Sequence, residues 1–455
     1  MSASTFTLPL QLSNVSISYL SIGLIGTVFL LFATLVRAYL RYKPSPLRRF
    51  SFSKLPHPNG GNPVVKVSHQ DSIYDESPNT TRTDDEIAAY GRFPDYAALS
   101  GVPLPTAYPK FDIIKALPRP YRPFRWAYHQ TMSFKKMEPD WWLELENTYI
   151  ERLAQRQELY GAYGSEIIQV LPGMEAACQE LMEMVLQFLV ARYPQYFSLE
   201  VTSSSPDGKP DVFVNRVINI RENILQTPPL EVLLKHVPED FALVKRNKDT
   251  GEYEFRGGIA CSSLGWSVKT KIGQGLRELH KIVPDYKEKM AKSMDRFFTK
   301  LPTSAPIQRG SWGLEYEKPL FCPPNHPHFL HRLTQNPDMP LSSIFLRVDW
   351  QTLRRLPLSG CIVFNFKALF TPLSEFQDEP KVPALLLKIL KEGKKSIMEY
   401  KDTWHVEHVA TPALEEWAKE QETNGLVKEG WEEETLEEYP LFERWEEKWR
   451  KQQGF

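Results

Sequence analysis

Residues 344–369 read IFLRVDWQTLRRLPLSGCIVFNFKAL and carry the clearest strand signals of the chain. Two runs in this stretch, Ile344–Val348 and Cys361–Leu369, are rich in the β-branched and aromatic side chains that are typical of β-strands. The segment between them, Trp350–Pro357, ends at a proline, which cannot donate a hydrogen bond to a neighbouring strand. The sequence therefore predicts two strands that flank a proline-stopped segment.

Further strands and helices are expected before this stretch. Residues 241–255 predict a β-hairpin with a turn-forming sequence at Asn247–Gly251. Weaker strand signals lie at Asp211–Ile220 and Gly257–Cys261. Boundary residues and apolar periodicity predict helices at about Pro139–Arg156, Met174–Arg192 and Tyr286–Leu301. Because helices and antiparallel strands occur in separate runs, the expected fold class is α+β.

An apolar segment near the N-terminus, Ile17–Leu40, is long enough to cross a bilayer as one helix. No charged side chain precedes it and several basic residues follow it, so the positive-inside rule places the domain in the cytosol. A cleaved signal peptide would need a basic region before the apolar run. Burial of this helix in a soluble core is a further alternative.

The sequence thus predicts a single-pass protein of the endoplasmic reticulum membrane. Its expected parts are a short lumenal N-terminus (1–16), a transmembrane helix (17–40), a flexible tether (41–100), a main domain (101–410) and a charged helical C-terminal segment (411–455).

Composition and motifs exclude several function classes. The net charge is -1 over 455 residues, which gives no electrostatic case for nucleic-acid binding. The four cysteines form no CxxC pair, so a reducing compartment suits them better than a disulfide framework. The sequence has no P-loop, dinucleotide fingerprint, HExxH motif or nucleophile elbow. Any electrons for redox chemistry must therefore come from another protein.

Two groups of histidines are candidates for binding a metal. His326, His328 and His331 lie in a proline-rich stretch with no acidic residue close in sequence, so an ordinary loop is the favoured interpretation. His280 follows an amphipathic stretch and precedes Pro284, where the next helix starts. A neutral imidazole at such a junction suits haem iron as an axial ligand. The pattern alone, however, favours a capping or core histidine.

Several motifs together resemble the haem-dependent oxidative N-demethylase alpha-subunit-like family, which is called the HRQ family in fungi. They are Pro123–Trp126 with Thr131-Met132, Arg192–Pro194 with Phe197, Leu279-His280 before Val283-Pro284, Arg309 with Trp312, and Phe345–Pro357 continuing into Ser359–Phe364. The last block is too long and unusual for a chance match. The resemblance covers roughly residues 105–410.

The resemblance implies a PAS-like antiparallel-sheet core, surrounded by helices, that holds haem b. It also implies a monooxygenase-type oxidation, such as oxidative N-demethylation of a small amine, with electrons from a separate flavin and iron–sulfur reductase. His280 matches the position of the haem iron ligand. Arg309, Arg347 and Arg354 are candidates for pairing haem propionates, because guanidinium groups bind carboxylates bidentately. Bracing of loops is the alternative for each arginine, and His129 is a weaker candidate for the pocket.

The same block contains a departure from the family. Bacterial members have Glu-Arg before Gln351, whereas this chain has Asp349 and Trp350, so one cation is lost near the expected pocket. A larger or more apolar substrate is the expected consequence. Gln351 and Thr352 are expected to fix the geometry of the strand and turn rather than to contact substrate.

Two other functions remain open from the sequence. One is a PAS-like sensor that binds haem or another ligand without turnover. The other is a non-enzymatic membrane scaffold, which would bind its partner through the C-terminal segment. That segment is rich in Glu and Lys and contains Trp417, Trp431, Trp445 and Trp449.

Overall fold

The computed structural model of the chain describes residues 82–129 and 131–454. The predicted membrane anchor, residues 17–40, lies outside these ranges, as does most of the predicted tether. Among the described residues, no helix is both long enough and apolar enough to cross a bilayer.

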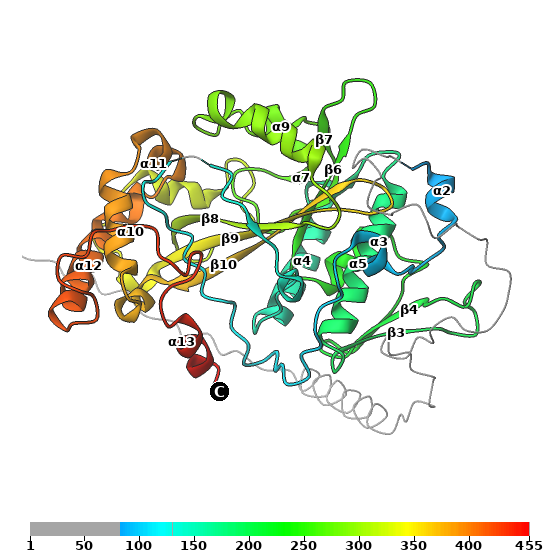
Figure 1. The fold of residues 1–455 in the computed structure, drawn as a ribbon, viewed down its shortest axis with the longest axis horizontal. Coiled ribbons are helices and arrows are strands. Elements are labelled where there is room, and N and C mark those ends of the chain that lie inside the picture. The colour runs from blue at the N-terminus through cyan, green and yellow to red at the C-terminus, as the bar shows by residue number, and fades with distance from the viewer. Residues whose placement is uncertain (1–81, 130, 455) are drawn as a thin grey trace, which may run out of the picture. The chain divides into compact units, whose positions relative to one another are not determined.

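A seven-stranded antiparallel sheet is the centre of the described chain (Figure 1). Its strand order is β1-β8-β9-β10-β6-β7-β2, and a smaller sheet has the order β3-β4-β5. The strands are β1 (Lys135–Lys136), β2 (Ile168–Val170), β3 (Phe197–Glu200), β4 (Val212–Asn215), β5 (Ile220–Asn223), β6 (Asp240–Arg246), β7 (Tyr253–Ile259), β8 (Ile307–Tyr316), β9 (Ile344–Arg355) and β10 (Ile362–Pro372). This arrangement, together with the helices, confirms the α+β class.

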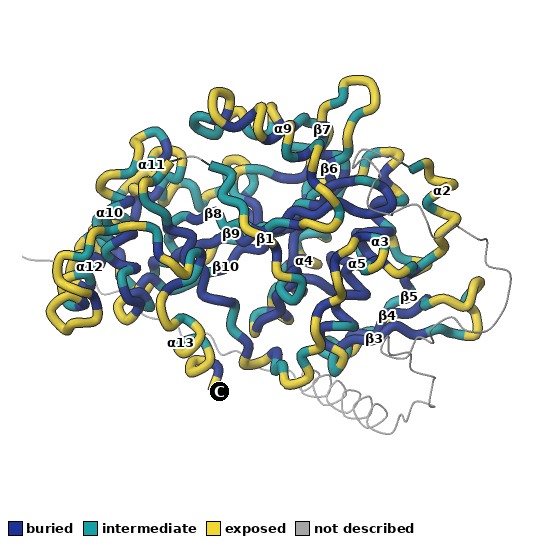
Figure 2. The backbone as a smooth tube through the Cα atoms, in the orientation of Figure 1, coloured by how far each residue is buried: buried dark blue, intermediate teal, exposed yellow. Residues whose placement is uncertain are grey.

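Helices pack on both faces of the large sheet. We call the face that packs against α5, α6, α10 and α12 the α12 face, and the face that packs against α7, α8 and α9 the α9 face. The helices are α2 (Asp84–Ala88), α3 (Tyr96–Ser100), α4 (Tyr149–Tyr163), α5 (Glu175–Arg192), α6 (Pro229–His236), α7 (Val268–Lys271), α8 (Leu276–Leu279), the π-helical turn η4 (Tyr286–Met290), α9 (Ala291–Lys300), α10 (Val382–Glu392), α11 (Lys395–Lys401), α12 (Trp404–Thr423) and α13 (Trp445–Gln452). Figure 2 shows that the buried backbone follows the sheet and α5.

The stretch that carries the strongest strand signals forms one long hairpin, β9–β10. β9 continues unbroken to Arg355, so most of the segment predicted to interrupt the strands is itself strand. Pairing with β8 on one side and β10 on the other holds it extended. The buried Arg355 donates hydrogen bonds to the carbonyls of Leu301 at 2.7 Å and Gly360 at 2.8 Å, which satisfies a charged side chain inside the strand. Pro357 lies in the turn that follows.

Other predicted elements are confirmed or corrected. The hairpin at 241–255 is β6–β7, and the helices predicted at 174–192 and 286–301 are α5 and η4–α9. The separate short strand expected at Gly257–Cys261 is the end of β7, and the strand expected at 211–220 is divided into β4 and β5.

The helix predicted at Pro139–Arg156 is not continuous. A short 3-10 turn at Pro139–Trp141 is followed by an extended segment, and α4 begins only at Tyr149. The buried carboxylate of Glu146 in this segment pairs with the ammonium group of Lys367 on β10 at 2.9 Å. This tertiary ion pair holds the segment against the sheet, and local periodicity does not report it.

The C-terminal segment is helical only in part. α12 begins at Trp404 and contains Pro412, whereas the sequence indicated that the helix starts at about that proline. Residues 424–444 are not helical, and α13 then forms the last helix of the described chain. Trp417 is buried in the core between α12 and the sheet.

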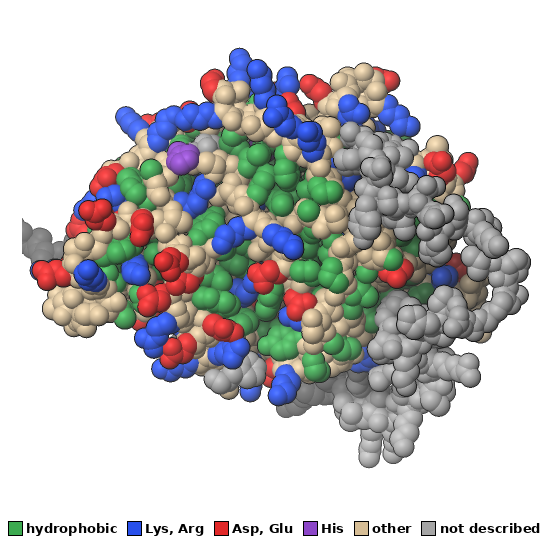
Figure 3. All heavy atoms as spheres, viewed as in Figure 1, with side chains coloured by type: hydrophobic (Ala, Val, Ile, Leu, Met, Phe, Trp, Pro, Cys, Tyr) green, Lys and Arg blue, Asp and Glu red, His purple; other side chains and the backbone are tan. Residues whose placement is uncertain are grey.

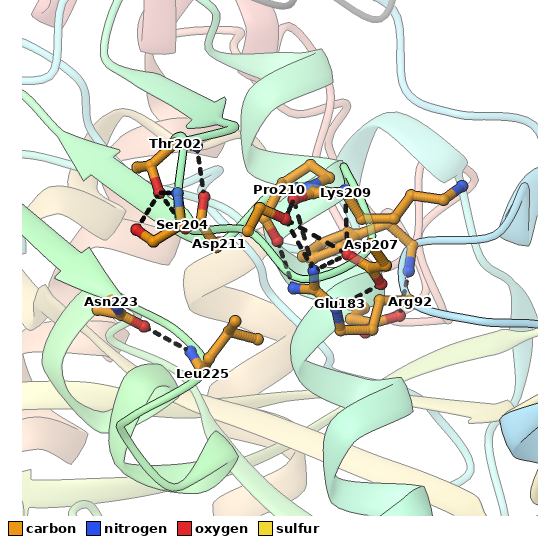
Figure 4. Close-up of polar contacts among 12 residues, drawn as sticks. Arg92, Glu183, Thr202, Ser204, Asp207, Lys209, Pro210, Asp211, Asn223 and Leu225 are labelled. Carbon is orange, nitrogen blue, oxygen red and sulfur yellow. Dashed lines mark hydrogen bonds and ion pairs between the residues drawn. The ribbon is translucent and has the colours of Figure 1, made fainter.

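The residues that precede the main domain are tied to it (Figure 4). Arg92 donates a hydrogen bond to Asp207 Oδ2 at 3.0 Å, in the loop between β3 and β4. The backbone N–H of Phe93 donates to the carboxylate of Glu183 on α5 at 2.7 Å. Residues 82–100, which the sequence assigned to a flexible tether, therefore form α2 and α3 and pack against α5. The tether prediction was wrong for this part because a few buried contacts are enough to order a polar segment.

Candidate functional site

His280 lies at the C-terminal end of α8, on the α9 face. Its Nδ1 is 2.7 Å from the carbonyl oxygen of Leu276, and its ring stacks on Tyr286 with centroids 5.0 Å apart. A carbonyl can only accept, so Nδ1 carries the proton and Nε2 carries a lone pair. Among the described residues, none hydrogen-bonds to Nε2. This is the arrangement of a metal-binding histidine, whose second nitrogen is oriented by a carbonyl.

The protonation state of His280 agrees with that geometry. Burial lowers the pKa of His280, and the nearby positive charges of Arg309 and Lys271 lower it further, against the effect of the Leu276 hydrogen bond. The imidazole is therefore neutral at pH 7, and a neutral imidazole is the form that binds a metal ion.

Arg309 lies on β8 with its side chain on the same face of the sheet. Within the described part of the chain it has no hydrogen-bond acceptor and no ion pair, and its Nε is buried without a partner. Arg125 is one of its charged neighbours, and the rings of Tyr128 and Tyr439 are also close. Burial lowers the pKa of Arg309, yet a guanidinium group stays protonated in proteins. The side chain of Arg309 is half-buried, and an anion bound beside it would supply the acceptor that its buried Nε lacks.

A second cation, Lys401, lies at the end of α11 beside Arg309. Its ammonium group donates to the carbonyl of Trp312 and lies 4.4 Å from the centroid of that indole ring. Burial lowers the pKa of Lys401 to about 7; the carboxylate of Asp349 opposes this shift and the charge of Arg309 adds to it. Lys401 is therefore only partly protonated at neutral pH, and the positive charge that favours an anionic ligand comes mainly from Arg309 and Arg125.

The strands supply an apolar floor beside these cations. Phe364 and Phe366 of β10 lie on the α9 face with ring centroids 5.6 Å apart, and Trp266 packs 6.0 Å from Phe366. Gln351 pairs directly with Arg309 across β8 and β9, so its half-buried side chain is on this face. We call the set His280, Arg309, Gln351, Lys401 and Phe364 the His280 site.

The neighbouring Thr352 points to the opposite face, where its hydroxyl donates to the Asn365 side chain. Thr352 therefore braces the strand, as expected, whereas Gln351 belongs to the site. Gln351 was not predicted as a site residue, because both Gln351 and Thr352 were expected to fix the geometry of the strand. Lys401 was not predicted either, because nothing in the sequence near Lys401 indicates contact with β8.

The other residues predicted from the sequence either lie outside the His280 site or already have hydrogen-bond partners. Arg347 lies on the α9 face, but its guanidinium donates to the carbonyls of Pro319 and Ser262 and to Asp349, which is the bracing role. His129 is exposed, with Nδ1 2.8 Å from the carbonyl of Ala127.

Arg354 points to the α12 face, because it is an odd number of residues away from Arg347 and Gln351 on one continuous strand. Its guanidinium lies 4.2 Å above the ring of Trp142, so it cannot share a ligand with His280. Trp350 also points to the α12 face and stacks on Tyr121, with ring centroids 3.7 Å apart. The exchange at 350 therefore changes the core on the α12 face and not the side chains of the His280 site.

The histidines at 326, 328 and 331 do not gather around one point. His328 does have an acidic partner, Glu315 of β8, whose carboxylate lies 3.6 Å from its Nε2. The sequence could not show this pairing, because Glu315 belongs to a different element. Across residues 82–129 and 131–454, no three His, Cys, Asp or Glu side chains are arranged to hold a metal ion. Haem iron needs only one such ligand from the protein, because its porphyrin supplies the other four.

The family described as "Haem-dependent oxidative N-demethylase, alpha subunit-like" matches residues 133–411, which include every member of the His280 site.

Proposed function

Because the chain belongs to the haem-dependent oxidative N-demethylase alpha-subunit-like family, we propose that it binds haem b at the His280 site and oxidises a small amine. The observation that carries the proposal is the pairing of a neutral histidine with a half-buried arginine: within the described residues Nε2 of His280 has no hydrogen-bond partner, and Arg309, whose Nε is buried, has no acceptor. These two residues match what haem requires, namely one nitrogen ligand for the iron and a cation for a propionate.

The topology supports a PAS-like core. Strands β6 and β7 come first in the chain, helices α7–α9 follow, and β8–β10 complete a five-stranded unit in which β6 and β10 are central neighbours. PAS domains have this strand order, and they bind ligands between the sheet and the inserted helices. The His280 site lies between those layers, on the α9 face.

When bound, haem supplies the activation of O2 that oxidation of a C–H bond next to nitrogen requires. His280 would hold the iron through Nε2, and the Leu276 carbonyl would keep its ring oriented. Arg309 would pair with a propionate. Phe364 and Phe366 would exclude water from one side of the ligand. The side chain of Asp349 is 32% exposed and its Oδ1 pairs with Arg347 at 2.9 Å, so its Oδ2 would be the oxygen that accepts from a protonated amine.

The electron donor would be a separate acidic redox protein that docks on α9. Residues 269–300 contain nine Lys or Arg and four Asp or Glu. Lys292, Arg296 and Lys300 form a stripe with helical spacing on the exposed side of α9, opposite the buried Met294 and Phe298. Figure 3 shows Lys and Arg side chains along the edge of the molecule where α9 lies in Figure 1. We name this set of three cations the α9 stripe.

Reversing charge on the α9 stripe is expected to slow electron transfer. In full-length haem-loaded protein, Lys292→Glu with Arg296→Glu should reduce the rate of reduction by an acidic ferredoxin at least about 10-fold at low salt, because steering depends on complementary charge. Stopped-flow absorbance at the haem band measures the rate. Adding salt should slow the unaltered protein and narrow the difference.

The matched control for that experiment is Lys419→Glu with Lys428→Glu, because both residues are exposed in or just after α12, on the other side of the sheet. Equal rates for the two double variants would show that the α9 stripe is not the docking surface.

The direct test of the proposed function starts from the full-length protein reconstituted with haem. We expect a Soret band, a CO complex after reduction, and O2 consumption with formaldehyde release when N-methylated amines and a reductant are added. A Soret band and CO complex without O2 consumption would instead establish a sensor. Failure to bind haem would contradict the whole proposal and favour the scaffold.

Location and membrane attachment belong to the same proposal. We propose that residues 17–40 anchor the protein in the endoplasmic reticulum membrane, with the described domain in the cytosol. The support for this is the apolar run and its basic C-terminal flank.

A further inference from the structure

A buried arginine, Arg354, lies on the face of the sheet away from the His280 site, and the described residues give it no acceptor. Arg354 is 5% exposed, its Nε is buried without a partner, and the described residues provide no hydrogen-bond acceptor for any of its nitrogens. Its contact is with the ring of Trp142, 4.2 Å from the guanidinium carbon. A cation–π contact stabilises the positive charge but leaves the in-plane N–H groups unsatisfied.

Glu180 of α5 is the carboxylate whose charge acts on Arg354, but it is not a full counter-ion. Its two oxygens accept hydrogen bonds from the backbone N–H groups of Leu358 at 2.7 Å and Ser359 at 2.8 Å. Burial raises the pKa of Glu180 to about 7, so close to half of this carboxyl is protonated at neutral pH. Burial lowers the pKa of Arg354 to about 10, so the guanidinium keeps its charge.

Arg354 lines a cavity of about 30 Å³. The cavity lies between Trp142, α5 and the segment that follows α3, and its other walls are mainly apolar. Met184 and Phe188 contribute from α5, and Pro103 contributes from the segment after α3. The space has room for one or two water-sized groups, so a phosphate or a longer carboxylate would extend beyond it.

We propose that this cavity, which we call the Arg354 cavity, binds one small monovalent anion of the size of chloride or formate. Water could accept hydrogen bonds from the guanidinium, but it would not neutralise a charge buried among apolar side chains. A monovalent anion satisfies both requirements and loses less hydration than a dianion. The bound anion would join β9 and α5 to the segment after α3, and would therefore stabilise the attachment of residues 96–105 to the domain.

The test compares anions by thermal unfolding of the full-length protein. At constant ionic strength, potassium chloride and potassium formate are expected to raise Tm by about 2–4 °C over potassium gluconate, whose anion is too large for the cavity. The rise should saturate with concentration, as binding at one site does. Crystals grown with bromide should show an anomalous peak beside the Arg354 guanidinium.

Two variants make the test specific. Arg354→Met is expected to remove the difference between chloride and gluconate, because it keeps side-chain length and removes the charge. Arg450→Met removes an exposed arginine that pairs with Glu446, so it should leave the difference intact. Haem absorbance should be unchanged in both, because the cavity and His280 lie on opposite faces of the sheet.

Two results would overturn the proposal: equal Tm values in chloride and gluconate, or no bromide peak in the cavity. Either would mean that the cavity holds only water. If Arg354→Met fails to fold, the anion series and the bromide experiment on the unaltered protein still decide the question. Loss of haem binding with a retained anion effect would contradict the proposed function and leave this inference intact.

Discussion

Replacing His280 with alanine is expected to abolish the Soret band of the haem-reconstituted protein while the domain stays folded. The substitution removes the imidazole whose Nε2 has no hydrogen-bond partner among the described residues. Loss of an outer-shell partner weakens metal binding roughly 10–100-fold, and loss of the ligand itself should exceed that. Haem titration followed by absorbance gives the affinity, and far-UV circular dichroism reports the fold.

The control is His129→Ala, because that histidine is exposed and contacts the carbonyl of Ala127. Its Soret band should match that of the unaltered protein. Added imidazole should restore a band in His280→Ala, because the lost side chain leaves room for it. An unchanged band in His280→Ala without imidazole would assign the ligand to another residue.

The pH dependence of the band has a definite sign. Protonation of His280 removes the lone pair that binds iron, and the pKa of His280 is lowered by burial and by the charge of Arg309. The neutral form therefore persists below the usual range of histidine, and the band should persist with it as the pH falls. Arg309→Met removes one of the charges that lower this pKa, so it should move the loss of the band to higher pH. It should also weaken haem binding.

The strand signals in the sequence were sufficient to find the hairpin β9–β10, but not its length. The long polar run in β9 looks like an interruption because its arginines are satisfied only by tertiary contacts, such as that of Arg355 with the Leu301 carbonyl. Treating the run as a break also concealed the faces of the sheet. Arg347 and Arg354 are seven residues apart, so on one unbroken strand they must point to opposite faces. The sequence does contain this odd spacing, but the spacing predicts opposite faces only if β9 is recognised as one unbroken strand.

His280 could be identified from its motif, but its state could not. The direction of its Nδ1 hydrogen bond and the position of Arg309 opposite Gln351 follow from the packing of α8 on the sheet and from strand register. Lys401 could not be predicted as a site residue, for a different reason. It comes 92 residues after Arg309 in the numbering, on a short helix whose local pattern does not indicate contact with β8. A single sequence does not show which residues far apart in the chain come into contact.

The second large effect is expected at Asp240, which is 0% exposed at the start of β6. Its Oδ1 accepts from the Arg156 guanidinium at 2.5 Å and from the Cys261 N–H at 2.9 Å, and its Oδ2 accepts from the Ser262 N–H at 2.8 Å. The carboxylate of Asp240 thus neutralises the buried charge of Arg156 on α4. It also holds the backbone of the loop that connects β7 to α7. The Ser262 carbonyl in turn accepts from Arg347 of β9.

Asp240→Asn should therefore lower the free energy of unfolding by about 3–5 kcal/mol, the range for breaking a buried ion pair by removing one partner. The amide keeps the shape of the side chain, but it leaves Arg156 without a counter-charge and directs a donor at groups that themselves donate. Urea unfolding followed by tryptophan fluorescence measures the change.

Asp295→Asn is the matched control, because Asp295 pairs with Arg277 at an exposed position; it should change stability by less than about 1 kcal/mol. Similar unfolding midpoints for the two variants would mean that Asp240 is not the link between α4 and the loop to α7. If the midpoints differ as expected, haem binding should also weaken in Asp240→Asn, because the loop it holds leads to Trp266 beside the apolar floor of the His280 site.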